Sequence, residues 1–311
     1  MNEAKNKAPD FPSSDYIRNL ENTLENLSYF ERRVFLKKRV VKNYPRFFYR
    51  YISLDSADNN SINKLRDIIV ESTLWLSSSD AFNDPFDTKA KVIINSSPDK
   101  LRGKIKQLLK THKPELGGIR RNQEINRIMA NQSELLKNIN NSTEKSFKKI
   151  GTCCFTTNPR NLLMWSHYAN QHKGIVLQFE VAKDISAFLK TVSVDYVKDY
   201  PIINWVNETE KEIRKGFLNK FEDWEYENEW RIVHVFGANT YIDFKPEALT
   251  GVVFGCKSDI SVKEAVKQLL TTRSQKKMPA VNIYNAFMHE SKYEVFIKGT
   301  SFDPPLAAPE A

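Results

Sequence analysis

Several features that mark whole classes of protein are missing from this sequence. No apolar run approaches the roughly 20 residues that a membrane-spanning helix needs. The first residues, MNEAKNKAPDF, lack the charged-then-apolar order of a secretory signal peptide. The three cysteines, two of them adjacent, fit neither a disulfide framework nor a zinc-binding spacing. We therefore expect a cytoplasmic protein without a membrane partner.

The short motifs of several common enzyme classes are also absent. The sequence contains no GxGxxG, no GxxxxGK[ST], no HExxH and no paired CxxC. These motifs carry the dinucleotide, nucleotide and zinc sites of Rossmann oxidoreductases, P-loop NTPases and zinc proteases. The sequence therefore argues against those three classes.

The chain does have ample apolar material and an excess of positive charge. Of its 311 residues 41% are hydrophobic, and the formal net charge is +9. Every charged residue from Arg32 to Arg50 is basic, and basic residues outnumber acids between Lys100 and Arg127. Such clusters attract polyanions, so nucleic acid is a predicted partner. A solvated helix face or a docking surface for an acidic protein would have the same composition.

The pattern divides the chain into a basic helical arm and one larger domain. Residues 1–12 predict a disordered tail, and a second tail is expected at 306–311. Apolar residues at three- and four-residue spacing predict a helix from about 13 to 42, within an arm that spans 13–45. The residues of this arm that we expect to bind nucleic acid are Arg32, Arg33, Lys37, Lys38 and Arg39.

Residues 46–305 predict a single α+β catalytic domain. Helices are expected at 61–72, 160–170, 206–221 and 260–272, and residues 99–148 predict a helical insertion broken at 114–118. Because strands and helices do not alternate regularly, we expect a mixed, mostly antiparallel, split sheet rather than a doubly wound parallel one. The strand-like runs are 46–54, 73–77, 89–95, 151–156, 174–181, 192–196, 229–235, 240–244, 250–254 and 292–298.

The NDPFD stretch at 83–87 follows the second of these strand-like runs. Asn-Asp-Pro is typical of a tight turn, in which Asn83 or Asp84 can accept backbone N–H bonds. We expect Phe86 to anchor this turn in the core. Asp87 would then be held rigidly at the edge of a cleft.

Trp165, Ser166, His167 and Tyr168 stand in a row before a loop and an apolar strand. On a helix, four successive side chains point in different directions, so some of them must face a surface or a cleft. Trp and Tyr offer stacking faces, and His can donate, accept or bind a metal. The alternative is that Trp165 and Tyr168 pack in the core while His167 bonds to the backbone.

A second group of candidates lies in DWEYENEWRIV, residues 223–233. An extended segment here puts Glu225, Glu227, Glu229 and Arg231 on one face. Three carboxylates on one face repel one another unless cations, substrate or solvent compensate them. Glu227 and Glu229 are therefore candidate catalytic carboxylates, although a plain surface Glu229–Arg231 pair would also explain part of the pattern.

Arg50 lies between Tyr49 and Tyr51 on a predicted strand. A cation between aromatic side chains can hold a phosphate or stack on a base. The alternative is that Arg50 reaches solvent at the edge of the strand.

These segments occur in an order that is typical of one family. YRYIS, LWLSSSDAFNDPFD, CFTTNPRNLLMWSHYANQHKGIVLQFEV and WEYENEWRIV follow one another along the chain. The chain resembles a widespread bacterial domain-of-unknown-function family with an FNDPFD-type turn, an MWSHY-type segment and an ExEWR strand. The resemblance covers residues 47–256, interrupted at 99–148, and by itself implies no activity.

The same order of elements is similar to the ADP-ribosyltransferase superfamily, and closest to its toxins that modify nucleic acids. This resemblance implies an ADP-ribosyltransferase-like split sheet, NAD as a substrate and a catalytic glutamate on a late strand. By position, that glutamate is Glu229, with Glu227 as a second carboxylate nearby. The NAD-binding residues that the resemblance and the neighbouring motifs imply are Arg50, Tyr51, Asn83, Asp84, Asp87, Trp165, Ser166, His167 and Tyr168.

On this resemblance we expect an NAD-dependent mono-ADP-ribosyltransferase that modifies nucleic acid, with RNA favoured over DNA. It would be the toxin of a bacterial toxin–antitoxin or anti-phage defence system, with an antitoxin or chaperone protein as partner. One alternative is a metal-dependent nuclease, with Asp84, Asp87, Glu227 and Glu229 around Mg²⁺ and His167 as the base. Another is a non-catalytic module that binds nucleic acid or a partner protein.

Overall fold

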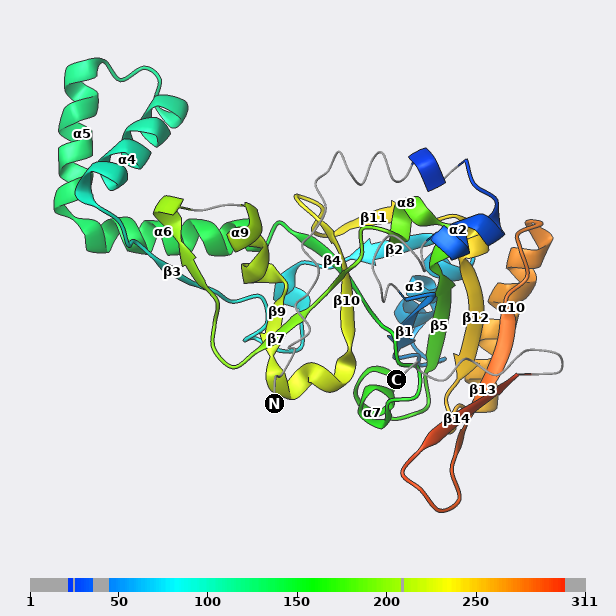
Figure 1. Ribbon diagram of the computed structural model, residues 1–311. Coiled ribbons are helices and arrows are strands. Elements are labelled where there is room, and N and C mark those ends of the chain that lie inside the picture. Colours follow the sequence, from blue (N-terminus) through cyan, green and yellow to red (C-terminus); the bar gives the residue numbers. More distant parts are fainter. Residues whose placement is uncertain (1–21, 25, 36–44, 208–209, 300–311) are drawn as a thin grey trace.

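The computed structural model describes residues 22–24, 26–35, 45–207 and 210–299 (Figure 1). The two predicted tails, and Lys37, Lys38 and Arg39 of the predicted arm, lie outside these ranges. No helix among the described residues is long and apolar enough to cross a bilayer.

The centre of the fold is an eight-stranded sheet. Its neighbouring strands are all antiparallel except β12 and β13, which are parallel. The predicted α+β class with a mixed, mostly antiparallel sheet is therefore confirmed. In spatial order the strands are β14 (Val295–Gly299), β13 (Asn282–Met288), β12 (Leu249–Phe254), β5 (Ile175–Glu180), β1 (Phe47–Ile52), β4 (Gly151–Thr156), β10 (Glu229–His234) and β6 (Val192–Ser193).

The sheet opens between β1 and β4. Strand β1 pairs with β5 along its whole length, whereas in the described chain it shares only the pair Tyr49↔Thr156 with β4. The start of β4 bridges instead to the residue that follows β2 (Thr73–Leu76). Aromatic packing closes the opening, because the rings of Phe48 and Phe155 lie 5.7 Å apart. We call this one-pair junction the β1–β4 seam.

Strand alternation gives the sheet two different faces. On one face, Phe48 and Phe155 join the main hydrophobic core, to which α3 (Asn59–Ile69) and α10 (Ile260–Gln275) contribute. On the other, Tyr49 and Tyr51 pack with Trp165 from α7 (Leu162–Tyr168). We call these the α10 face and the α7 face. Which face a residue occupies decides whether it can reach the site described below.

The helical insertion consists of α4 (Pro98–His112), α5 (Gly118–Ala130) and α6 (Gln132–Phe147). It extends from the side of the molecule opposite to α10 (Figure 1). Helices α4 and α5 share a small core of their own around Leu101 and Ile125, while α6 packs with β3 (Lys91–Ile93) and β8 (Ile202–Asn204). The predicted break at 114–118 is present, but a second break was missed: Asn131 ends α5 and caps α6 by accepting the Glu134 N–H.

The described part of the N-terminal region is not one continuous helix. Residues 22–24 are helical, the chain turns at 26–28, and α2 (Tyr29–Phe35) begins afresh. The reason is a capping box, since Ser28 and Glu31 each bond to the backbone N–H of the other. Leu24 is fully buried in the main core, so this part of the region packs onto the domain.

The remaining elements are short. Strand β2 pairs with β11 (Thr240–Asp243), β3 with β8, and β7 (Asp195–Val197) with β9 (Asn219–Phe221). The prediction of an extended segment over residues 223–228 is wrong, because η5 (Glu222–Glu227) is a 3₁₀ helix that ends at Asn228 in a left-handed conformation. The other helices are α8 (Ile185–Phe188), α9 (Glu210–Phe217), η2 (Ser79–Ala81), η3 (Val181–Lys183), η4 (Trp205–Asn207) and η6 (Pro246–Ala248).

Candidate active site

A cluster of buried charges lies beside strand β10. Glu229 and Arg231 project from the α7 face of the sheet, because Glu229 and Tyr49 both pair with Thr156. The NDPFD turn, β9 and η5 supply three further charges. Each of the five residues is at most 6% exposed. We call them the buried charge network: Asp87, Lys220, Glu227, Glu229 and Arg231.

Arg231 holds one half of this network together. Its Nε and Nη2 donate to the two oxygens of Glu229 at 2.8 and 3.0 Å, and Nη2 also donates to Asp87 Oδ2 at 2.6 Å. Its Nη1 donates to the carbonyl of Phe217 at 3.1 Å. Burial acts to raise the pKa of Glu229, but the adjacent Arg231 and Lys220 outweigh it and lower that pKa to about 2. Glu229 is therefore a fixed anion.

Lys220 holds the other half. Its ammonium contacts Glu227 Oε2, lies 3.1 Å from Glu229 Oε2 and 3.9 Å from Asp87 Oδ2. The indole of Trp224 covers it at 4.9 Å. Burial acts to lower the pKa of Lys220, yet the carboxylates around it raise that pKa above its ordinary value. The lysine therefore stays charged inside the protein, where it compensates carboxylates on three different segments.

Glu227 links this network to the surface. Tyr168 donates its hydroxyl proton to Glu227 Oε1 at 2.6 Å, and Asn83 donates to the same hydroxyl oxygen at 3.0 Å. Burial raises the pKa of Glu227, and Lys220 only partly offsets that effect. A chain of hydrogen bonds thus leads from the exposed Asn83 through Tyr168 to a carboxylate that holds a proton more readily than an ordinary glutamate.

Four rings stand over this chain, and we call them the aromatic rim: His167, Tyr168, Trp224 and Tyr226. His167 is exposed and the other three are half-buried. His167 Nδ1 lies 3.1 Å from the Tyr226 hydroxyl, and the rings of Trp224 and Tyr226 are 6.0 Å apart. Aromatic rings of this kind can stack on a flat heteroaromatic ligand.

Asn161 fixes the two halves of the rim relative to each other. Its side-chain oxygen caps α7 by accepting the N–H groups of Leu163 and Met164. Its amide nitrogen donates to the carbonyl of Tyr226 at 2.9 Å. One residue that the sequence analysis did not single out therefore joins the MWSHY helix to η5. The signal that could have identified it is an Asn directly before a helical apolar run.

Several residues predicted for the site are not part of the rim, and two of them pack in the core on the α7 face. Trp165 is fully buried, donates to the carbonyl of Pro159 and meets the ring of Tyr51 edge-on at 5.2 Å. Tyr51 donates its hydroxyl to the carbonyl of Asn158. Ser166 Oγ lies 3.4 Å from His172 Nε2, away from the rim. The structure thus brings His167 and Tyr168 to the surface site and assigns Trp165 and Tyr51 to the core.

Arg50 is not part of this assembly. It lies opposite Leu177 of β5, and its guanidinium contacts Cys153; both of these neighbours belong to the main core. Because side chains alternate along β1, the same geometry that puts Tyr49 and Tyr51 on the α7 face puts Arg50 on the α10 face. Arg32 is one of the basic residues predicted to bind nucleic acid. It lies in α2, and its Nε donates to the carbonyl of Leu24.

The NDPFD turn forms, but two of its residues exchange the expected roles. Asp84 accepts the Phe86 N–H on Oδ1 at 2.8 Å and the Asp87 N–H on its carbonyl at 3.2 Å, as a tight turn requires. Phe86, however, is 64% exposed, so the prediction that it anchors the core is wrong. Asp87 is the buried residue, because Arg231 provides a partner for its charge.

The nuclease alternative predicts that Asp84, Asp87, Glu227 and Glu229 surround Mg²⁺. A Mg²⁺ site needs several oxygen ligands that turn toward one open point. Here the ammonium of Lys220 already lies among Asp87, Glu227 and Glu229. Within the described ranges, no group of three or more His, Cys, Asp or Glu side chains is placed to hold a metal ion.

Comparison with known proteins identifies one family. The model of a family described as a protein of unknown function (DUF2971) matches residues 164–232. This match confirms the expected resemblance to a domain-of-unknown-function family. No curated protein and no solved structure matches the chain. The matched span runs from α7 to β10, and so contains the aromatic rim and every member of the buried charge network except Asp87.

Proposed function

Because the family that matches the site region has no assigned function, we propose one from the site itself: transfer of ADP-ribose from NAD to nucleic acid, with RNA favoured over DNA. The observation that carries this proposal is the environment of Glu227. Its side chain is 3% exposed, accepts a hydrogen bond from Tyr168, and lies under the aromatic rim.

The proposed reaction assigns a task to each part. The rim stacks on the nicotinamide ring of NAD, whose positive charge suits an aromatic face. The bond between ribose C1′ and the nicotinamide nitrogen breaks, and its electron pair leaves with nicotinamide. The carboxylate of Glu227 stabilises the positive charge that develops on the ribose. A hydroxyl or N–H group of the acceptor then bonds to C1′, and Glu227 takes the proton that the acceptor loses.

The two candidate glutamates differ in what they can do. Glu229 is bound by both arms of Arg231, and its pKa of about 2 makes it a poor proton acceptor. Glu227 has a raised pKa and hydrogen bonds to a half-buried tyrosine at the surface. We therefore assign the catalytic role to Glu227, and to Glu229 the positioning of Lys220 and Arg231.

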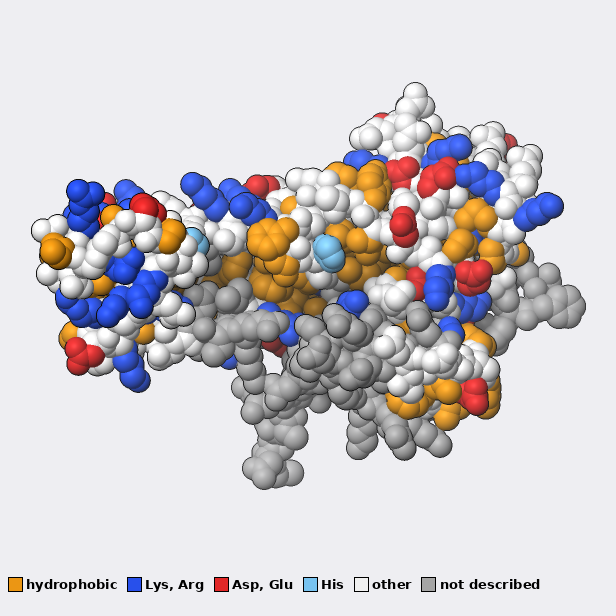
Figure 2. All heavy atoms as spheres, turned by 90° about the horizontal axis from the view of Figure 1, so that it is seen from above, with side chains coloured by type: hydrophobic (Ala, Val, Ile, Leu, Met, Phe, Trp, Pro, Cys, Tyr) orange, Lys and Arg blue, Asp and Glu red, His pale blue; other side chains and the backbone are white. Residues whose placement is uncertain are grey.

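The nucleic-acid acceptor is proposed from surface charge. Lys and Arg side chains gather over the end of the molecule that α4 and α5 form (Figure 2). Arg102, Lys106 and Lys110 form a row of exposed side chains at four-residue spacing on α4. Such a row can follow a phosphate backbone. A role as the toxin of a toxin–antitoxin or defence system is part of the same proposal.

The test is transfer of label from NAD to RNA, DNA and cell protein in separate reactions. We expect label on RNA, and its loss by a factor of about 100 or more in Glu227→Gln, since a charge-stabilising group typically contributes that much. Glu225→Gln is the matched control. Glu225 belongs to the same 3₁₀ helix but is exposed, so its amide variant should retain activity.

Other outcomes separate the alternatives. Cleavage of nucleic acid that needs Mg²⁺ and stops with EDTA would establish the nuclease. Binding of RNA without transfer or nicotinamide release, unchanged in Glu227→Gln, would establish the non-catalytic module. Equal transfer by wild type and Glu227→Gln would remove Glu227 from the chemistry.

A further inference from the structure

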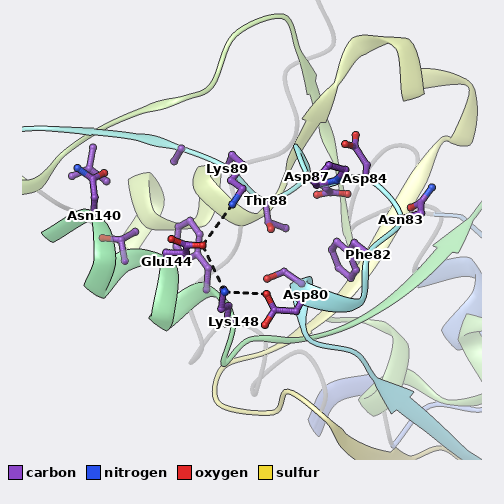
Figure 3. A pocket seen from close by; sticks show the side chains of 16 residues that line it. Asp80, Phe82, Asn83, Asp84, Asp87, Thr88, Lys89, Asn140, Glu144 and Lys148 are labelled. Atoms are coloured by element: carbon purple, nitrogen blue, oxygen red, sulfur yellow. Dashed lines mark ion pairs between the residues drawn. The ribbon is translucent and has the colours of Figure 1, made fainter. Parts of the chain in front are cut away.

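A cavity lies beside the NDPFD turn, on the side that faces the insertion. Its volume is about 470 Å³, within the range of roughly 300–1,000 Å³ in which small-molecule sites fall. One wall is the loop from Ser79 to Val92, and the other is α6, which contributes Asn140, Thr143 and Glu144 (Figure 3). The cavity therefore exists only where core and insertion meet.

Asp87, which lines this cavity, has one carboxylate oxygen without a partner in the described chain. Asp87 is 6% exposed, and its Oδ2 is bonded to Arg231. Its Oδ1 is also buried, yet it accepts no hydrogen bond from any described residue. Leaving such an oxygen unpaired is costly, and the cost is removed when a donor binds. This atom is not used by the proposed transfer reaction.

The charges of the cavity are unevenly compensated. At the α6 end, Lys148 lies 3.2 Å from Asp80 and 3.7 Å from Glu144, and Lys89 lies 3.8 Å from Glu144 (Figure 3). These two lysines therefore compensate the charges of Asp80 and Glu144. Asp87 lies at the other end of the cavity, beside a further acid of the same turn. That end has no lysine among its lining residues. Arg231, which is not a lining residue, pairs with Asp87 Oδ2 and leaves Oδ1 without a partner among the described residues.

Apolar surface completes the cavity. Phe82 and Phe147 line it from opposite walls, together with Val92. A ligand that fits must therefore combine an apolar body with a positively charged group that carries N–H donors.

We infer that this cavity binds a small organic cation, with an ammonium or guanidinium group donating to Asp87 Oδ1 and an alkyl body between Phe82 and Phe147. The inference does not rest on the proposed transfer reaction, because that reaction uses neither this cavity nor Asp87 Oδ1. It assigns to the NDPFD turn a binding role of its own, and it makes α6 one wall of a ligand site.

The test is calorimetric titration of the full chain with agmatine, which carries a guanidinium and an ammonium on a four-carbon chain. Diacetylputrescine, which has the same chain without charge, is the matched ligand. We expect agmatine to bind and the neutral compound to bind more weakly by about tenfold or more, as the loss of a charged hydrogen bond predicts.

Two neighbouring asparagines of α6 provide matched variants. Asn140 lines the cavity and Asn141 does not, and both are exposed. Asn140→Trp should weaken agmatine binding by about tenfold or more, while Asn141→Trp should leave it unchanged. Asp87→Asn should also weaken agmatine binding. Because Asp87 belongs to the buried charge network, this variant can also change stability, and the comparison of Asn140→Trp with Asn141→Trp is therefore the decisive one. No binding of agmatine, equal binding of the neutral compound, or equal binding by both Trp variants would overturn the inference.

Discussion

Arg231 is a buried arginine that joins two carboxylates from distant parts of the chain. It is 1% exposed, and its guanidinium serves Glu229 and Asp87 together. A buried ion pair adds little stability compared with apolar residues of the same shape, because removing charges from water is costly. Removing one partner alone is different, since the remaining charges stay buried and uncompensated.

Arg231→Met should therefore lower the free energy of unfolding by about 3–5 kcal/mol. The measurement is urea denaturation followed by circular dichroism. Arg66→Met is the control: Arg66 is 47% exposed and lies 3.9 Å from Glu71, so its loss should cost less than about 1 kcal/mol. Similar losses in the two variants would mean that the buried charge network does not contribute to stability as described.

Single residues were the hardest part of the site to predict. The sequence indicated that Glu227 and Glu229 need compensation and that Asp87 lies at the edge of a cleft, but it could not show that Lys220 compensates all three. Arg231 and Asp87 are 144 positions apart in the chain, so no local pattern connects them. Lys220 itself had one signal, a single cation inside the apolar stretch FLNKF.

At the scale of elements, Asn161, together with His167 and Tyr168, joins the α7 region to η5. Asn161→Ala removes the cap of α7 and the bond to the Tyr226 carbonyl. We expect a loss of about 1–2 kcal/mol in the free energy of unfolding and, on the proposed function, a larger drop in transfer than that loss alone explains.

Asn131→Ala is the matched control for this prediction. Asn131 caps α6 in the same way, through the Glu134 N–H, but it lies in the insertion away from the rim. It should cost about the same stability, again about 1–2 kcal/mol, and leave transfer intact. If both variants lose transfer equally, general destabilisation rather than loss of rim geometry would be the cause.

Elements with a clear period were predictable and those without one were not. Strand β5 reads as one apolar run and α10 follows a helical stripe with Asp259 as its cap, and both lie where the pattern indicated. Residues 223–228 alternate like a strand, yet 223–227 belong to η5 and Asn228 ends it, with Glu227 turned inward to Lys220 and Glu225 left exposed. Strand β13 was missed, since only Tyr284 and Ala286 in it are buried.

At the scale of the whole molecule, the basic side chains of the insertion lie on different elements from the aromatic rim. Its outer helices have their own small core, so α4 and α5 present basic side chains without taking part in the main core. If the proposed acceptor is RNA, this end of the molecule should determine the affinity, while the rim determines the reaction.

Replacing Arg102, Lys106 and Lys110 together by Gln should therefore weaken RNA binding. The slope of log affinity against log salt should become shallower by about 2, since each phosphate contact on a single strand contributes about 0.7. Nitrocellulose filter binding at several salt concentrations measures both quantities. The control, with the same change of charge, replaces the exposed Lys267, Lys277 and Lys292 by Gln and should have little effect. Equal slopes for the two variants would remove α4 from the binding surface.

The fold class could be predicted because it depends on the order of elements, whereas the site depends on which face each element presents. The mixed antiparallel sheet followed from irregular alternation of strands and helices. The exclusion of Arg50 from the site depends on its register against Leu177, which cannot be read from the sequence of β1 alone.

The β1–β4 seam has a consequence for how the molecule responds to temperature. Strands β1 and β4 share one residue pair, and the ring of Phe48 also contacts Phe155 and Trp230 across the seam, with centroids 5.7 and 5.5 Å apart. Hydrophobic contacts weaken on cooling. We therefore expect the large sheet to soften first along this seam on cooling. The seam separates β4 and β10, beside which the buried charge network lies, from β1, β5 and β12.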